Sequence, residues 1–147
     1  MPLLIPSPKQ ITPSALSAVW MASLVSTVLL PLGVLFLLDV FVEVRSFQPE
    51  FGPYALAIGG ALVIGSYLLA QRFRAEYIDN HTPPAANDEE ALRAYAKKFF
   101  FGLGIAETPC YAAIFYYLMT TDVSWTLALC AASIFLITRY KPSWPPV

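Results

Sequence analysis

Four long apolar runs constrain this chain more than any other feature of its sequence. They cover residues 15–38, 53–70, 99–119 and 123–138. Apolar runs of about 20 residues suffice for an α-helix to cross the hydrocarbon core of a bilayer. The chain is 57% hydrophobic and only 13% charged, whereas soluble domains are roughly 25% charged. The sequence therefore predicts an all-α integral membrane protein, with four transmembrane helices in one domain of 147 residues.

Local signals predict where the helices begin and how they connect. Thr12 is suited to cap the first helix, and a proline follows it at the first helical position. The third helix is expected to begin near residue 88, well before its apolar run, with Asn87 as N-cap and Glu90 reaching back to it. The short turn at 120–122 predicts that the third and fourth helices form an antiparallel hairpin.

Basic residues lie almost entirely on one side of the predicted topology. Eight of the nine share that side, namely Lys9, Arg72, Arg74, Arg93, Lys97, Lys98, Arg139 and Lys141. Only Arg45 lies on the other. The positive-inside rule therefore predicts cytoplasmic N and C termini and a bacterial inner (cytoplasmic) membrane. Aromatic residues are expected to mark both membrane interfaces. The inner ones are Trp20, Tyr95, Tyr140 and Trp144, and the outer ones are Tyr54, Tyr116, Tyr117 and Trp125.

Small residues recur at i, i+4 and i+8 in two of the spans. They are Ala57, Ala61 and Gly65 in the second span, and Gly104, Thr108 and Ala112 in the third. This spacing lets helix backbones approach closely. Two interpretations remain open, which are packing within one bundle and a docking surface for another subunit.

Glu107 is the one ionisable residue well inside a span, and it is the main candidate for a functional group. Acidic residues inside a membrane are costly and mark functional sites by default. Helical spacing places Gly104 and Tyr111 on its face, and Pro109 is expected to free a backbone carbonyl near Ile105. Glu107 is thus expected to act as a polar contact between helices, as a binding group for a partner or cofactor, or as a proton or ion carrier.

The segment Gly102-Leu-Gly-Ile-Ala-Glu107-Thr-Pro-Cys-Tyr111 resembles the third helix of some uncharacterised bacterial four-helix membrane proteins. It is more distantly similar to the carboxylate-bearing helix of rotary ATPase proteolipids. The resemblance covers about one helix of the four. The first span lacks the glycine repeat of a proteolipid, Glu107 lies on the first helix of a hairpin, and the termini face the opposite way. The proton-turbine function of proteolipids is therefore not carried over.

Motifs of catalysis and metal binding are missing from the sequence. It has no glycine-rich phosphate loop, no Ser/His/Asp set and no HExxH, so no catalytic residue and no metal site is predicted. His81 is the sole histidine and lies in a loop, which argues against haem held by an axial histidine in a span. No cofactor is predicted, although contact with a lipid, quinone or pigment stays open. Cys110 and Cys130 are expected to be neighbouring free thiols.

These observations favour a small non-catalytic accessory subunit of a larger bacterial inner-membrane complex, respiratory or photosynthetic. Its expected partners are membrane lipids and other membrane-protein subunits. Nucleic acid is not expected, because the net charge is only −1. Two alternatives stay open, which are a proton- or ion-carrying transport element that uses Glu107 and a membrane enzyme acting on a lipid or quinone.

Overall fold

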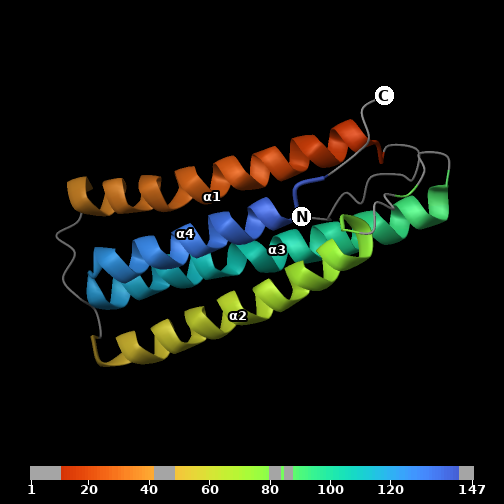
Figure 1. The fold of residues 1–147 in the computed structure, drawn as a ribbon. Coiled ribbons are helices and arrows are strands. Elements are labelled where there is room, and N and C mark those ends of the chain that lie inside the picture. Colours follow the sequence, from red (N-terminus) through yellow and green to blue (C-terminus); the bar gives the residue numbers. More distant parts are fainter. Residues whose placement is uncertain (1–10, 42–48, 80–83, 85–87, 143–147) are drawn as a thin grey trace.

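The computed structural model describes residues 11–41, 49–79, 84 and 88–142, and within them the chain is all-helical (Figure 1). The elements are α1 (Pro13–Phe41), the short 3-10 turn η2 (Pro49–Phe51), α2 (Gly52–Tyr77), α3 (Glu89–Thr120) and α4 (Val123–Arg139). The prediction of an all-helical chain is confirmed, and the described residues contain four α-helices. By length and composition α1, α2 and α3 are able to cross a membrane, and α4 is a shorter apolar helix.

Side-chain caps set the starts of α1 and α3. The Ala15 N–H donates to Thr12 Oγ1 at 3.2 Å, as the sequence predicted. At α3 the N-cap is Asp88, whose carboxylate accepts from the Ala91 N–H at 3.0 Å. The prediction that Asn87 caps this helix is therefore wrong by one residue, and Asn87 itself lies outside the described residues. With Asp88 as cap, Glu90 is one position too early for a reciprocal capping box.

A tight turn joins α3 to α4, and the predicted antiparallel hairpin is confirmed. Thr121 ends α3 in the left-handed conformation with φ 58°. Asp122 then caps α4, because its carboxylate accepts from the Ser124 N–H at 2.8 Å. In Figure 1 the two helices lie side by side, with α1 along one edge of the bundle and α2 along the other.

Aromatic rings fill the core where α2 ends and α3 begins. The ring of Phe73 lies 5.0 Å from that of Tyr140 and 5.4 Å from that of Tyr95, measured between centroids. Only 1% of Tyr140 and 2% of Tyr95 is exposed. These two tyrosines, like Tyr116, are thus buried within the bundle and do not lie on its outer surface. Their expected depth at a membrane interface stays a prediction. Aromatic rings supply large packing area, and here they hold three helices together.

Gly102 is the position at which this aromatic core tolerates no added atom. A Cβ built there would overlap the ring of Tyr140, whereas a Cβ at Gly104 on the same helix meets nothing within 4 Å. We expect Gly102→Ala to lower the free energy of unfolding by about 1–3 kcal/mol through overpacking. Gly104→Ala is expected to leave it unchanged or raise it by about 0.5–1 kcal/mol, because alanine favours helix. Thermal unfolding of both variants in detergent tests this, and equal stabilities would contradict it.

Candidate functional site

Two prolines inside helices remove backbone hydrogen bonds in the interior of the bundle. Proline has no N–H, so the carbonyl four residues earlier loses its helical donor. Pro31 in α1 frees the carbonyl of Thr27 in this way, and Pro109 in α3 frees that of Ile105. An unpaired backbone carbonyl in an apolar interior costs free energy comparable to a lost hydrogen bond. Both carbonyls therefore need donors from elsewhere.

Each of the two carbonyls accepts a hydrogen bond from another helix. Ser66 of α2 donates to the Ile105 carbonyl at 3.1 Å, and Thr108 donates to the same oxygen at 2.7 Å. The Cys110 thiol of α3 donates to the Thr27 carbonyl of α1 at 3.7 Å. The carbonyl that the sequence predicted to be free is thus occupied within the bundle. Sequence reasoning missed Ser66 as its donor, because nothing in the spacing of α2 pairs that residue with α3.

A buried serine from α4 completes this polar layer. Ser133 donates to the carbonyl of Ala106, and its side chain is fully buried. Helix α3 is therefore bonded to α2 through Ser66, to α4 through Ser133 and to α1 through Cys110. Three bonds in different directions fix the rotation of α3 about its axis. They also fix the direction in which Glu107, the next residue after Ala106, leaves the helix.

Glu107 lies at the surface of α3 and has no partner within the described residues. It is half-buried, and no hydrogen bond or ion pair to its carboxylate occurs there, including none to Tyr111. Tyr111, one turn later, is 54% exposed, and Gly104, one turn earlier, is exposed beside open space. Pro109, the remaining member of the predicted site, is buried on the side facing the bundle. The site is therefore an outward patch of Gly104, Glu107 and Tyr111.

The small-residue stripe of α2 also points outward. Ala57, Ala61 and Gly65 are all exposed, and a Cβ at Gly65 would meet nothing within 4 Å. Packing within this chain uses a different face of α2, whose buried small residues include Gly59 and Ser66. The interpretation of Ala57, Ala61 and Gly65 as contacts inside the bundle is thus wrong. Their use as a partner interface stays a prediction.

An open apolar groove of about 600 Å³ lies between the first half of α2 and the second half of α3. Side chains that form its walls include Tyr54, Ile58, Thr108, Tyr111, Ala112 and Phe115. Two members of the predicted small-residue face of α3, Thr108 and Ala112, thus line this groove. Tyr111 belongs both to the groove and to the face of Glu107, so the groove and the Glu107 patch adjoin.

The two cysteines are neighbours, as their positions on a hairpin suggested. Their sulfur atoms lie 3.9 Å apart, and both are free and buried. Leu129 and Ala113 pack with them in an apolar cluster. This pair belongs to the interior of the bundle and forms no part of the outward patch.

Within the described residues, no group of histidine, cysteine and acidic side chains is arranged to hold a metal ion. His81 lies outside those residues. Comparison of the chain with protein-family models, with curated proteins and with solved structures finds no match.

The bond from Ser66 to the Ile105 carbonyl can be tested by a double-mutant cycle. Ser66→Ala is expected to cost about 0.5–2 kcal/mol of unfolding free energy. Pro109→Ala restores an N–H that can bond to Ile105 within the helix, so the cost of Ser66→Ala should shrink in that background. Unfolding in detergent of the two single variants and the double variant measures the difference.

Ser26→Ala provides a matched control for this cycle, because the Ser26 hydroxyl bonds only within α1 on an exposed face. Its cost should be the same with and without Pro109→Ala. A cost of Ser66→Ala that is equal in both backgrounds would show that Ser66 does not serve the carbonyl freed by proline.

Proposed function

We propose that the chain is a multi-pass protein of the bacterial inner membrane and a non-catalytic accessory subunit of a larger complex there. Membrane insertion is supported by the three long apolar helices and by the many large apolar side chains on their surface. Leu29, Phe36, Ile64 and Phe101, for example, are each more than 60% exposed. A chain in water would not leave so many such groups uncovered, whereas lipid covers them without cost.

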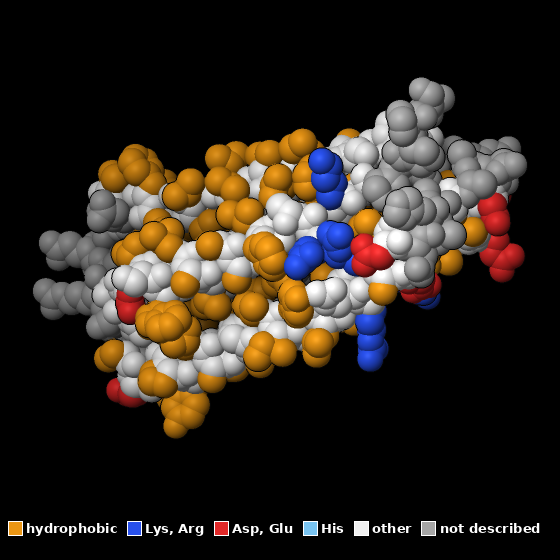
Figure 2. Space-filling view, in the orientation of Figure 1, with side chains coloured by type: hydrophobic (Ala, Val, Ile, Leu, Met, Phe, Trp, Pro, Cys, Tyr) orange, Lys and Arg blue, Asp and Glu red, His pale blue; other side chains and the backbone are white. Residues whose placement is uncertain are grey.

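The orientation that we propose, with both termini in the cytoplasm, is supported by the location of the basic residues. The end of α2 and the start of α3 lie at one end of the bundle, and α4 ends on the side toward it (Figure 1). These segments carry Arg72, Arg74, Arg93, Lys97, Lys98, Arg139 and Lys141. Figure 2 shows Lys and Arg side chains gathered toward that end, beside a long apolar surface. Lys9 and Arg45 lie outside the described residues.

The observation that carries the subunit proposal is the outward Glu107 without a partner. A carboxylate within a bilayer is costly unless another group satisfies it, and such groups almost always face protein or a water-filled cavity. The bundle supplies no such group among its described residues. A donor from a second membrane protein would offset this cost, and so would account for the direction in which Glu107 points.

The surface around Glu107 supports the proposal of a partner helix. The apolar groove between α2 and α3 adjoins it through Tyr111. Beside the groove, the exposed residues Ala57, Ala61 and Gly65 have small side chains, so another helix could approach the backbone of α2 closely. Small residues of this kind are enriched where membrane helices meet. A transmembrane helix of another subunit is therefore the occupant that we propose for this face.

A proton- or ion-carrying role is the second candidate, and it rests on the same carboxylate. It requires copies of this chain to meet at Glu107, or a wet cavity beside it. The four apolar runs contain no other acidic, basic or histidine side chain to which a proton could pass. That observation favours the accessory subunit.

Gentle extraction and native electrophoresis, followed by mass spectrometry of the co-migrating chains, test the proposal. We expect unlike membrane subunits to migrate with the wild-type protein. Ala61→Leu should weaken the association because the larger side chain blocks close approach to α2. Glu107→Gln should weaken it because an amide replaces the carboxyl group that the partner would bind. Ala22→Leu is the matched control, since Ala22 is an exposed alanine on α1, far in the fold from the proposed face.

A monomer alone in the wild-type extract would refute the subunit proposal. A homo-oligomer alone would favour the carrier, and proton flux through reconstituted vesicles with Glu107→Gln would then decide. Release of the chain from membranes by alkaline carbonate would refute membrane insertion itself.

A further inference from the structure

Arg139, in the last turn of α4, lies over aromatic rings from two helices. Its guanidinium carbon is 5.0 Å from the ring centroid of Phe135 on α4 and 5.9 Å from that of Tyr67 on α2. Rings at this distance attract a cation and hold the planar guanidinium in one place. The side chain is therefore positioned at the seam between α2 and α4.

The guanidinium is only partly satisfied by the protein. Arg139 is half-buried, and its Nε is enclosed with no hydrogen-bond partner in the described part of the chain. Arginine presents five N–H donors in a fixed plane that matches the oxygens of a phosphate or carboxylate. The enclosed Nε is out of reach of an outside ligand, so an anion would bind through the two Nη groups of this half-buried side chain. Its charge would offset the cost of burying the guanidinium.

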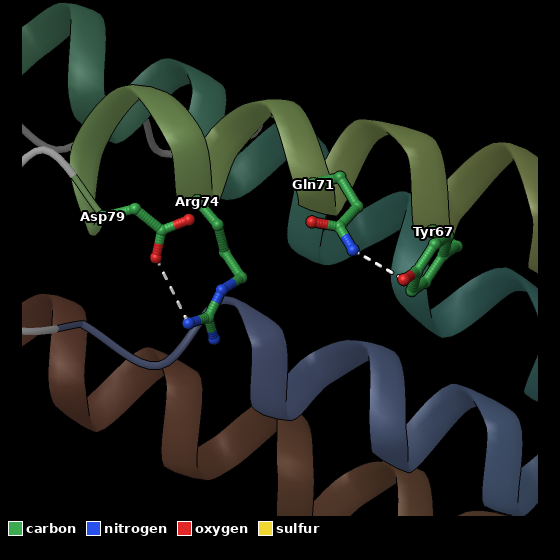
Figure 3. Close-up of polar contacts among 4 residues, drawn as sticks. All are labelled: Tyr67, Gln71, Arg74 and Asp79. Atoms are coloured by element: carbon green, nitrogen blue, oxygen red, sulfur yellow. Dashed lines mark hydrogen bonds and ion pairs between the residues drawn. The ribbon is translucent and has the colours of Figure 1, made fainter.

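Further donors lie on the adjoining turns of α2 (Figure 3). Gln71 Nε2 donates to the Tyr67 hydroxyl oxygen at 2.6 Å, so the Tyr67 proton stays available to an acceptor. Arg74 follows one turn later, and its Nη2 lies 3.4 Å from Asp79 in a long, largely solvent-exposed ion pair. Within this cluster one carboxylate, that of Asp79, pairs with Arg74. Because Arg74 and Arg139 are both cationic, the cluster keeps a net positive charge.

Two backbone carbonyls at this end of α4, which could otherwise accept hydrogen bonds from the Arg139 guanidinium, already accept them from other groups. The Ile137 carbonyl accepts from the Trp20 indole at 2.9 Å and from the Tyr140 N–H at 3.0 Å. The Thr138 carbonyl accepts from the Lys141 N–H at 3.2 Å. Carbonyls at a helix end otherwise attract a nearby arginine.

We propose that Arg139, Tyr67, Gln71 and Arg74 form a binding site for the phosphate of an anionic phospholipid. The site lies where the apolar part of α4 ends, which is headgroup depth in the membrane orientation proposed above, and the inference rests on that orientation. The cytoplasmic leaflet is rich in anionic lipids, and basic pockets between helices on that side bind their headgroups. Two turns nearer the start of α2, a Cβ built at Gly60 would meet nothing within 4 Å, and the proposed lipid would lay an acyl chain along that part of the helix.

Native mass spectrometry of the full chain in detergent, with added phosphatidylglycerol or phosphatidylcholine of the same acyl chains, tests the site. We expect the wild-type protein to retain phosphatidylglycerol in preference. Arg139→Gln should weaken that retention by roughly five- to tenfold. Arg139→Lys should lose part of it, because lysine keeps the charge and loses the planar stack on the rings. Arg93→Gln, at an exposed base of α3 near the same end, is the matched control and should bind as the wild type does.

Equal retention of both lipids, or unchanged retention by Arg139→Gln, would overturn the site. Displacement of the lipid by millimolar inorganic phosphate would show a site for free anions and would also overturn it. Should Arg139→Gln fail to fold, Arg139→Lys carries the comparison. Alkaline carbonate extraction separates the two proposals, since a chain that stays in the membrane without lipid preference refutes only the lipid site.

Discussion

Satisfaction of backbone carbonyls inside an apolar layer is the constraint on which the rest of this structure depends. Water does not reach the buried interior of the bundle, so a proline within one of its helices leaves a costly unpaired carbonyl. Here the carbonyls of Thr27 and Ile105 accept from side chains of neighbouring helices. The same side chains, together with Ser133, set how α3 is rotated. The hydrogen bonds that satisfy the two carbonyls freed by proline therefore also join neighbouring helices of the bundle.

The rotation of α3 has a direct consequence for its one acidic residue. Ala106 and Cys110 face the interior, and Glu107 is half-buried on the flank of α3, between the buried face and the exposed Gly104 and Tyr111. The groove beside it and the exposed small residues of α2 lie on that outward side as well. Packing and candidate function are therefore not independent, since the polar layer that stabilises the fold also sets the face of α3 on which the carboxyl group lies.

The two proposals place different partners on different faces. A partner helix is proposed for the side of α2 and α3 that carries the groove, where small residues and a lone carboxylate provide shape and one polar contact. A lipid phosphate is proposed for the seam of α2 and α4, where Arg139 is held over Phe135 and Tyr67. Charge is concentrated at the second site and almost lacking at the first. In the proposed orientation the first site lies in the hydrocarbon core, where charge is costly. The second lies at the headgroups, where basic residues meet anionic lipids.

The sequence by itself determined the number of helices, their approximate ends and the α3–α4 hairpin, because run length, caps and turns are local properties. It also showed that Glu107 is the one acidic residue within the apolar runs and that Pro109 frees the carbonyl of Ile105. Tertiary structure alone decided which faces point inward. Ala57, Ala61 and Gly65 looked as suitable for packing as Gly59 and Ser66, yet only the latter two are buried. Nothing local showed that Tyr95 lies inside the bundle. A helix that is apolar on every side carries no inside-or-outside pattern, so only fit against its neighbours chooses the buried face.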